Sequence, residues 1–226
     1  MDLNFDIRTS DSPFVEMLWR THSDYAGSFT SQADNHWEMV ITTYQGKTTI
    51  AIRGPETVAT TADYPAEAAF FGIVFKHGTF MPYLPAVNLI DRNDEILPAA
   101  TGNNFWLQGA TWEIPTFENA DTFVERLIGQ ELIVCEPVVG AVLANRPLEM
   151  SPRTVQRRFL RATGLTQGTF VQIGRALQAV EFLERGLSIA DAVFQAGYAD
   201  QPHLTRSLQR FMGQTPGQIL RENEAE

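Results

Sequence analysis

The sequence predicts an α+β fold, in which a β-rich N-terminal domain (residues 1–118) precedes an all-α domain (residues 119–226). Three observations predict this division. Runs of β-branched and aromatic residues separated by turn residues fill the first part, whereas apolar residues recur at three- and four-residue spacing in the second. The charge also changes, because residues 1–136 carry seven basic and nineteen acidic side chains but residues 151–221 carry nine arginines and four acids. Such an asymmetry indicates two domains with different partners.

The composition limits the class of protein. The 226 residues are 44% hydrophobic and 19% charged, with a formal net charge of −10, which is typical of a soluble globular protein and excludes fibrous and disordered classes. No apolar run approaches the roughly 20 residues that span a bilayer, and the acidic start lacks the features of a signal peptide. We therefore expect a cytoplasmic protein with no membrane partner. The single Cys135 lies in the apolar run LIVC, which favours a buried core thiol over a reactive one.

Short strands are predicted along the N-terminal domain. The stretch HWEMVITTYQGKTTIAIRG has strand-forming runs on both sides of Gln45 and Gly46, which predicts a hairpin turn there. The stretch AAFFGIVFKHG predicts a buried strand that is closed by a glycine. Prolines and short polar runs separate these segments from the rest.

From Asn119 onward the pattern is helical. Helices are expected in FVERLIGQELIV and in VVGAVLAN. The stretch TFVQIGRALQAVEFLERG then predicts a linker helix of about 16 to 18 residues, which would be about 25 Å long.

Two copies of an internal repeat lie on either side of this linker helix. SPRTVQRRFLRATGLT, which starts at Ser151, matches DQPHLTRSLQRFMGQT, which starts at Asp200. Each copy begins with a helix N-cap residue near a proline and ends at a glycine suited to a left-handed conformation. The identical positions pair Arg157 with Arg206, Arg161 with Arg210, Gly164 with Gly213, and Thr166 with Thr215. Each copy therefore predicts one short helix with well-defined ends.

The second copy follows the stretch SIADAVFQAGY. Ser188 and Asp191 form a capping-box pattern, and Gly197 permits a tight turn. A helix, a short glycine turn and an exposed polar helix make a helix-turn-helix, whose second helix enters the DNA major groove. The linker helix could hold two such recognition helices about 34 Å apart, which is one turn of DNA.

On these residues the chain resembles the AraC/XylS family of transcription regulators. The resemblance covers about residues 122–221 and is closest in GLSIADAVFQAGYADQPHLTRSLQRFMGQTPGQIL. It implies a bacterial, sequence-specific regulator, an activator or a repressor, that binds double-stranded DNA through two helix-turn-helix motifs. Arginine and glutamine suit this task, because they bond bidentately to guanine and adenine. The implied DNA-binding residues are Arg153, Thr154, Gln156 and Arg157 in the first recognition helix, and Gln201, Pro202, His203 and Arg206 in the second.

The first helix-turn-helix departs from the family pattern. Glu149 stands where the family usually has a turn glycine, Asn145 replaces a small buried residue, and Pro147 must end the preceding helix early. Whether this first motif reads bases stays open. Arg161 and Arg210 lie farther along their helices and suit phosphate contacts or a structural role.

The N-terminal domain resembles the degenerate cupin-like sensor domains that precede this DNA-binding module in many bacterial regulators. The stretches IRGPETVA, FFGIVFKHGTFMPYLP and LIDRNDEILP carry the resemblance. It implies a cupin-like half-barrel that binds a small-molecule effector or a partner subunit. RNA polymerase and a second copy of the chain, as a homodimer, are further candidate partners.

We expect no catalytic residue, no cofactor and no metal. The histidines His22, His36 and His77 are widely spaced, and His203 has no second ligand at metal-binding spacing. The acidic run Asp91, Asp94 and Glu95 is more typical of a solvated loop than of an acid–base pair. The four tryptophans either pack in the core or line an effector pocket, and both interpretations stay open; they are Trp19, Trp37, Trp106 and Trp112.

Two other functions are alternatives to the regulator. The first is a partner-binding protein whose DNA module has partly decayed, which only the irregular first motif supports. The second is an enzyme fused to the module, as in DNA-repair methyl acceptors. Those enzymes need a reactive cysteine and a cysteine-rich zinc site, which a chain with one cysteine does not provide.

Overall fold

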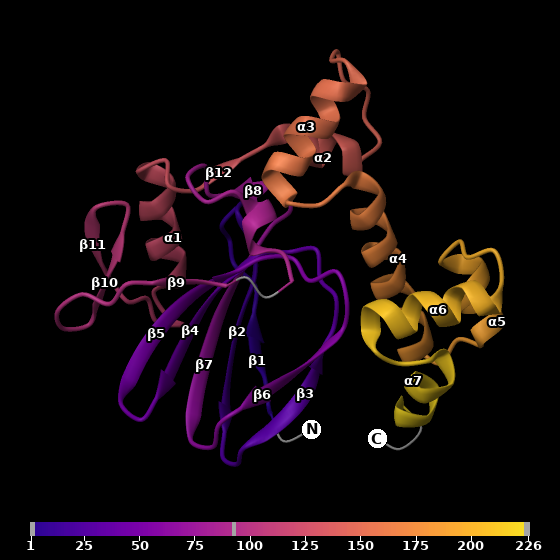
Figure 1. The fold of residues 1–226 in the computed structure, drawn as a ribbon, viewed down its shortest axis with the longest axis horizontal. Coiled ribbons are helices and arrows are strands. Elements are labelled where there is room, and N and C mark those ends of the chain that lie inside the picture. Colours follow the sequence, from indigo (N-terminus) through magenta and orange to yellow (C-terminus); the bar gives the residue numbers. More distant parts are fainter. Residues whose placement is uncertain (1–2, 92–93, 224–226) are drawn as a thin grey trace. The chain divides into compact units, whose positions relative to one another are not determined.

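The computed structural model describes residues 3–91 and 94–223, and it confirms the predicted α+β fold class (Figure 1). Strands fill the first half of the chain. The strands are β1 (Asp6–Arg8), β2 (Val15–Ser23), β3 (Gly27–Ser31), β4 (Glu38–Tyr44), β5 (Lys47–Arg53), β6 (Thr60–Tyr64), β7 (Ala68–Phe75), β8 (Thr79–Phe80), β9 (Glu95–Leu97), β10 (Asn104–Leu107), β11 (Ala110–Glu113) and β12 (Val134–Cys135).

Helices dominate the second half of the chain. The helices are the 3₁₀ helix η1 (Ala86–Leu89), which precedes β9, and α1 (Ala120–Gly129), α2 (Pro137–Leu143), α3 (Pro152–Thr163), α4 (Gln167–Glu184), α5 (Ile189–Gln195), α6 (Gln201–Met212) and α7 (Pro216–Asn223). The linker helix α4 has 18 residues, as its apolar periodicity predicted. No helix among the described residues is long and apolar enough to cross a membrane.

A six-stranded antiparallel sheet forms the N-terminal part, in the order β1-β2-β7-β4-β5-β9. The predicted hairpin is confirmed, since β4 pairs with β5 and the turn residues Gln45 and Gly46 have φ of 50° and 72°. Positive φ at both turn positions matches the right-handed twist of the strands. One face of the sheet carries the core side chains, which alternate along each strand, such as Met39 and Ile41 on β4 and Ile50 and Ile52 on β5.

Helix α1 completes this core. Its buried face contributes Phe123, Val124 and Leu127 to the same hydrophobic cluster as the sheet. Trp37 also lies in the cluster, where it stacks on Phe75 with ring centroids 3.9 Å apart. These large apolar side chains are removed from water, which is the main term that stabilises the sheet.

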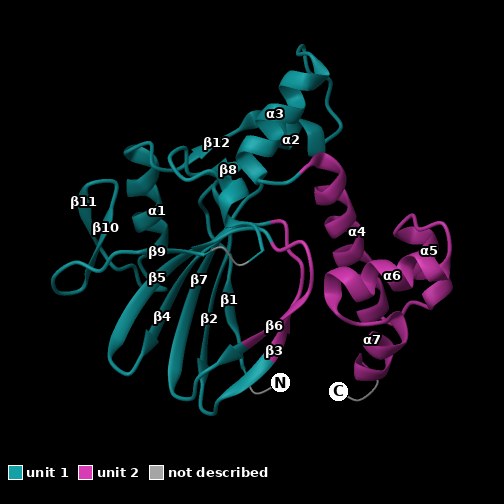
Figure 2. Ribbon diagram, in the orientation of Figure 1, with its two compact units in different colours: residues 1–28, 36–55, 63–165 teal, residues 29–35, 56–62, 166–226 magenta. Residues whose placement is uncertain are grey.

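The chain divides into two compact units (Figure 2). Unit 1 comprises residues 1–28, 36–55 and 63–165, so it includes the sheet and the helices α1 to α3. Unit 2 comprises residues 166–226 together with two short N-terminal segments, residues 29–35 and 56–62. We call these two segments the docking segments. The predicted boundary between residues 118 and 119 concerns domains that fold by themselves, and it stays a prediction.

Two local predictions were wrong. Cys135 is exposed and lies in the short strand β12, which pairs with β8 in a two-stranded sheet. The helix expected in FVERLIGQELIV ends at Gly129, because Glu131 takes a left-handed φ of 55° and turns the chain toward β12. In the apolar run LIVC only Val134 and Cys135 form a strand, and burial ends within the run, since Ile133 is buried and Cys135 is not.

Candidate DNA-binding surface

Helix α6 forms as the repeat predicted. Asp200 caps it by accepting a hydrogen bond from the His203 backbone amide at 2.7 Å, and Gly213 ends it with φ of 73°. Leu204 and Leu208 are fully buried on one side of the helix. The opposite side presents the four residues that the sequence assigned to DNA, and all of them are exposed: Gln201, Pro202, His203 and Arg206.

The turn before α6 is held by an arginine from the linker helix. Arg175 on α4 donates from Nε to the carbonyl of Ala196 at 3.1 Å and from Nη2 to the carbonyl of Gly197. Its guanidinium also lies 4.7 Å from the centroid of the Tyr198 ring. These contacts satisfy carbonyls at the end of α5, which otherwise lack helical partners. Arg175 therefore ties the turn between α5 and α6 to the linker helix, a structural role that the sequence did not reveal.

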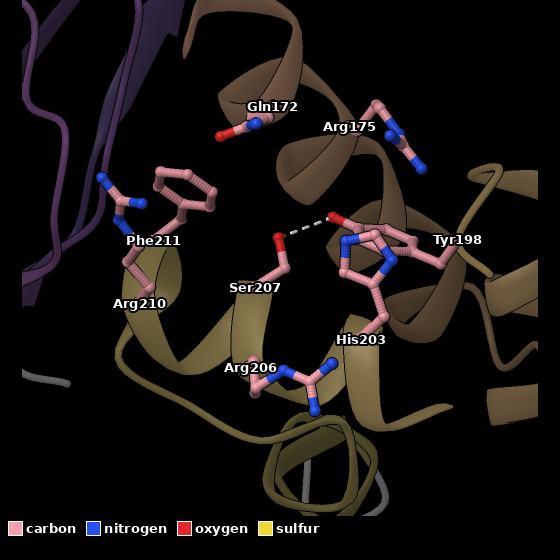
Figure 3. Close-up of a pocket in the computed structure, with 8 residues that line it drawn as sticks. All are labelled: Gln172, Arg175, Tyr198, His203, Arg206, Ser207, Arg210 and Phe211. Carbon is pink, nitrogen blue, oxygen red and sulfur yellow. Dashed lines mark hydrogen bonds between the residues drawn. The ribbon is translucent and has the colours of Figure 1, made fainter. Parts of the chain in front are cut away.

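A polar groove lies between α4 and α6, with a volume of about 270 Å³ (Figure 3). At its centre the Tyr198 hydroxyl and the Ser207 hydroxyl are 2.9 Å apart, and the His203 ring meets the Tyr198 ring edge-on. Burial raises the pKa of the Tyr198 hydroxyl, an effect that the Ser207 hydrogen bond and the Arg175 charge oppose. The described residues that line the groove include three arginines and no acid. The groove therefore presents positive charge beside the exposed face of α6.

The first helix-turn-helix has the same caps but a longer turn. Ser151 caps α3 by accepting from the Thr154 backbone amide, and Gly164 ends it with φ of 74°. Eight residues, 144–151, separate α2 from α3, whereas five, 196–200, separate α5 from α6. Helix α2 ends at Leu143, well before Pro147, in agreement with the early ending that the proline predicted.

The residues assigned to DNA in α3 are not equally available. Arg153, Gln156 and Arg157 are exposed, whereas Thr154 is partly buried and its hydroxyl lies 3.0 Å from that of Ser151 at the cap. Arg158, on the same helix, bonds through Nε and Nη2 to both carboxylate oxygens of Glu136, at 2.8 and 2.7 Å. Glu136 is buried and also caps α2, so this pair fixes α3 against α2.

Helix α3 belongs to unit 1 and α6 to unit 2. The spacing of about 34 Å between the two recognition helices, which the linker helix suggested, stays a prediction.

The docking segments are the largest feature that sequence reasoning missed. They pack on the C-terminal end of α6, where the amides of Ala33 and Ala59 donate to the carbonyls of Phe211 and Arg210 at 2.6 and 2.9 Å. No local signal marks them, because the partners are separated by most of the chain.

Unit 1 contains a second hollow, of about 540 Å³, against the sheet. Its walls combine Ile41, Phe71 and Phe117 with polar side chains that include Thr43 and Thr48. None of the four tryptophans is among the described residues that line it. Trp37 and Trp112 are buried in the core, and Trp106 is exposed, so core packing is the observed role of the first two.

The structure gives partners to two sets of residues that the sequence offered as candidates, the histidines and the acidic run. His36 and His77 stack with ring centroids 3.9 Å apart, although they are distant in sequence. Among the described residues, no group of three or more histidine, cysteine or acidic side chains could hold a metal ion. Asp94 accepts from Arg53 at 3.1 Å, so this acid of the Asp91–Glu95 run has a structural partner.

Comparison with known proteins supports the helical motif. A family model described as a helix-turn-helix domain matches residues 145–222. The HTH-type transcriptional regulator VirS of Mycobacterium tuberculosis is 35% identical over 100 residues, in strains CDC 1551 / Oshkosh and ATCC 25618 / H37Rv. The match covers 43% of this chain and 29% of VirS, so it spans less than a third of that relative's length. The helix-turn-helix that the repeat predicted is thereby confirmed.

Two solved structures of ToxT from Vibrio cholerae are similar over most of the chain, at 10% sequence identity. One covers 96% of this chain and 98% of its own, with a TM-score of 0.40. The other, bound to (E)-4-(8-methylnaphthalen-1-yl)but-3-enoic acid, covers 97% and 99% with a TM-score of 0.43.

Proposed function

We propose, from the helix-turn-helix domain model that matches residues 145–222, that this chain is a sequence-specific DNA-binding transcription regulator of the AraC type. The observation that carries the proposal is the second motif. Its recognition helix α6 is capped at both ends, buries one face and exposes the four side chains expected to meet DNA. In such motifs the N-terminal residues of the second helix read base edges in the major groove.

The exposed side chains have the chemistry for this task. Arg206 can bond bidentately to guanine, and Gln201 can bond bidentately to adenine. Arg210 and the other cations of the groove supply positive charge, which attracts the phosphates of DNA. In α3 the corresponding readers are Arg153, Gln156 and Arg157, with Thr154 beside the helix cap.

We assign effector binding to the 540 Å³ hollow of unit 1. Among the described residues that line it, the one arginine is Arg20, which is already paired with Asp6 at 2.7 Å and with Glu118 at 3.0 Å. An anionic ligand would have to break these pairs, whereas a neutral one would not. The hollow therefore suits an uncharged, partly aromatic molecule that packs on Phe71 and Phe117 and bonds to the threonine hydroxyls.

In this scheme the effector acts by binding alone, without a chemical reaction. It binds one conformation better than another and so shifts the fraction of protein that engages DNA.

RNA polymerase and a second copy of the chain are the protein partners we expect. The cytoplasm is the expected location because the DNA is there. We propose that the chain is not an enzyme, since its similarity is to transcription regulators.

The test is selection of bound duplexes from a random DNA pool with purified full-length protein, at a stated moderate salt concentration. Two enriched blocks about one helical turn apart are the expected result, because both recognition helices would then read sequence. One block would restrict readout to α6 and leave α3 as a support, which the longer turn before α3 would explain. No enrichment, with and without a screened effector, would contradict the regulator function and favour the partner-binding alternative.

A further inference from the structure

His203, one of the residues expected to read DNA, lies against the side chain of Tyr198. The two rings meet edge-on, with centroids 5.1 Å apart and an interplanar angle of 85° (Figure 3). His203 is exposed, whereas Tyr198 is only 7% exposed, so a ring of the protein interior supports one side of a surface side chain. Edge-to-face ring pairs are favourable beyond the apolar area that they bury. Tyr198 therefore restricts the orientations that the His203 ring adopts.

Tyr198 is itself held from two other sides. Its hydroxyl lies 2.9 Å from the hydroxyl of Ser207 on α6. The guanidinium of Arg175 lies 4.7 Å from the centroid of the ring, an arrangement in which the cation is attracted to the ring face. Arg175 is fixed in turn by its hydrogen bonds to the carbonyls of Ala196 and Gly197. A rotation of the Tyr198 ring would therefore break the hydroxyl contact and the cation–π contact together.

The backbone sets the points from which both rings extend. Helix α5 is followed by a left-handed residue, Gly197, with φ of 70°, and the Tyr198 amide donates to the carbonyl of Val193 at 2.9 Å. A bond of this span after a left-handed glycine is typical of a Schellman motif. At the start of α6 the His203 amide donates to the Asp200 carboxylate at 2.7 Å. The end of one helix and the cap of the next thus fix the two Cα positions.

A reader that is already oriented has an advantage in binding DNA. A free surface side chain gives up its rotamers when it meets a base edge, and this loss of entropy opposes binding. A side chain that the protein holds in place has lost those rotamers before DNA arrives. A neutral imidazole has one ring nitrogen that donates and one that accepts, so its orientation decides which groups of a base edge it can bond. The orientation of His203 therefore affects both the affinity and the choice of base.

The repeat offers an internal comparison. In the first motif the positions of Tyr198, His203 and Ser207 are taken by Glu149, Thr154 and Arg158. None of these three side chains has a ring. The Thr154 hydroxyl lies against the helix cap, and Arg158 binds a buried carboxylate. Of the two motifs, the second therefore has an oriented ring at the third residue of its recognition helix, and the first does not.

We propose that Tyr198 is a positioning residue, which orients His203 to read one base pair of the site that α6 recognises. The inference rests on the proposed regulator function and adds a residue that determines its specificity. Tyr198 acts through His203, while Ser207 and Arg175 keep Tyr198 in place. The base pair that His203 meets is accordingly read more strictly than the corresponding base pair under α3.

A double-mutant cycle tests whether Tyr198 acts through His203. The full-length protein is titrated with a duplex selected by the wild type, and with duplexes in which each base pair of the α6 block is changed. The variants are Tyr198→Leu, His203→Ala and the two together. We expect Tyr198→Leu to weaken binding by about 2- to 10-fold and to reduce discrimination at the same base pair as His203→Ala does. In the His203→Ala background, Tyr198→Leu should change the affinity by less than about 2-fold.

Two further variants separate the ring from its burial. Tyr198→Phe keeps the ring and loses only the hydroxyl, so it should retain most of the wild-type discrimination. Phe211→Leu is the matched control, because Phe211 is a ring of the same groove that is only 3% exposed and lies beside Arg210. Any change of affinity that Phe211→Leu causes should be the same with and without His203→Ala.

Two results of the cycle would overturn the inference. In the first, Tyr198→Leu weakens binding equally in the wild-type and His203→Ala backgrounds, which would mean that Tyr198 supports the fold of the motif and not the reader. In the second, His203→Ala binds with wild-type affinity and discrimination. A wild-type protein that selects no duplex would contradict the regulator function itself, and the inference with it, so the failures are distinguishable.

A measurement on the wild-type protein keeps the inference testable if Tyr198→Leu fails to fold. The chain has four histidines, so the ring signals of histidine-labelled protein are few, and the spectrum of His203→Ala assigns the one in question. Without DNA, we expect a nuclear Overhauser effect between the His203 and Tyr198 rings and a single χ1 rotamer of His203. A His203 ring that averages over several rotamers and shows no such effect would overturn the inference.

Discussion

The backbone amide of Ala33 donates a hydrogen bond to the carbonyl of Phe211 at 2.6 Å, and it thereby joins the strand-rich half of the chain to the end of its recognition helix. The bond satisfies a carbonyl that the helix itself leaves without a partner. It also explains why residues 29–35 belong to the same compact unit as α6. With this bond, the linker helix α4 is not the only element that positions α6.

Arg206→Ala tests base reading by α6. If Arg206 reads a guanine, the substitution should cost about 1–3 kcal/mol of specific affinity, or about 5- to 150-fold in Kd, because a bidentate pair is lost. The measurement is a titration of the selected duplex and of the same duplex with each base pair changed. Gln209→Ala is the control, since Gln209 is exposed on the same helix but is not an expected reader. Unchanged discrimination at every position would remove Arg206 from the readout.

Arg153→Ala tests the first motif in the same way. Arg153 is exposed near the start of α3, so a similar loss of affinity, confined to the block of the binding site that α3 reads, is the expected result. Footprinting on the selected duplex checks it. Full protection of both blocks with wild-type affinity would show that Arg153 does not contribute to DNA binding.

Salt dependence tests the electrostatic part of the interface. We expect the logarithm of the affinity to fall linearly with the logarithm of salt concentration, by roughly tenfold or more between 50 and 200 mM, since each phosphate contact releases counterions. Arg210→Ala should reduce this slope by about one phosphate contact, because Arg210 lines the basic groove. Affinity that does not change with salt would contradict the interface described here.

Glu136→Gln tests what holds α3 in place. Glu136 is buried and accepts from both Nε and Nη2 of Arg158, so the substitution should lower the free energy of unfolding by about 1–3 kcal/mol. Chemical denaturation measures the change. The matched control is Glu181→Gln, which removes an exposed pair with Arg185 and should change stability by no more than about 0.5 kcal/mol. Equal effects of the two substitutions would show that the Glu136–Arg158 pair does not stabilise the motif.

The Asp121 carboxyl predicts a pH dependence. Burial raises the pKa of Asp121, but the hydrogen bond from Ser10 and the ion pair with Arg8 at 2.8 Å outweigh it, so the pKa lies below its ordinary value. A lowered pKa in the folded state stabilises the protein above the unfolded value of about 4, and this contribution is lost as pH falls through the folded value. Asp121→Asn should therefore lower stability at pH 7 and flatten its decline in acid.

Thermal unfolding between pH 7 and pH 3 measures that decline. Glu125→Gln, an exposed position on the same helix α1, is the control and should leave the pH profile unchanged. A profile for Asp121→Asn that parallels the wild type would show that the Ser10 and Arg8 contacts are not coupled to folding.

Much of the helical part could be predicted from the sequence, because its signals are local. Ser151, Ser188 and Asp200 each accept a hydrogen bond from an amide three residues later, and Gly164 and Gly213 supply the left-handed ends. The repeat then gave the exposed faces of α3 and α6 without any knowledge of tertiary contacts. Periodicity likewise gave the length of α4 and the hairpin between β4 and β5.

Residues with long-range partners could not be predicted in this way. The run LIVC contains Cys135 and looks like core, but pairing of β12 with β8 turns the thiol outward. Arg158 and Arg175 are two of the nine arginines of residues 151–221, and the sequence does not show that one binds Glu136 and the other binds the turn after α5. In each case the partner is distant in sequence and leaves no periodic trace.

The sequence by itself determined the helix-turn-helix repeat, its caps and its exposed side chains, since those depend on residues within a few positions of one another. Only the tertiary structure decided that residues 29–35 and 56–62 pack on the C-terminal end of α6. Their bonds to Phe211 and Arg210 are made by backbone amides and carbonyls, which every residue except proline carries. Such a contact depends on where the backbone runs and not on which side chains it carries. No pattern of residues could therefore have revealed it.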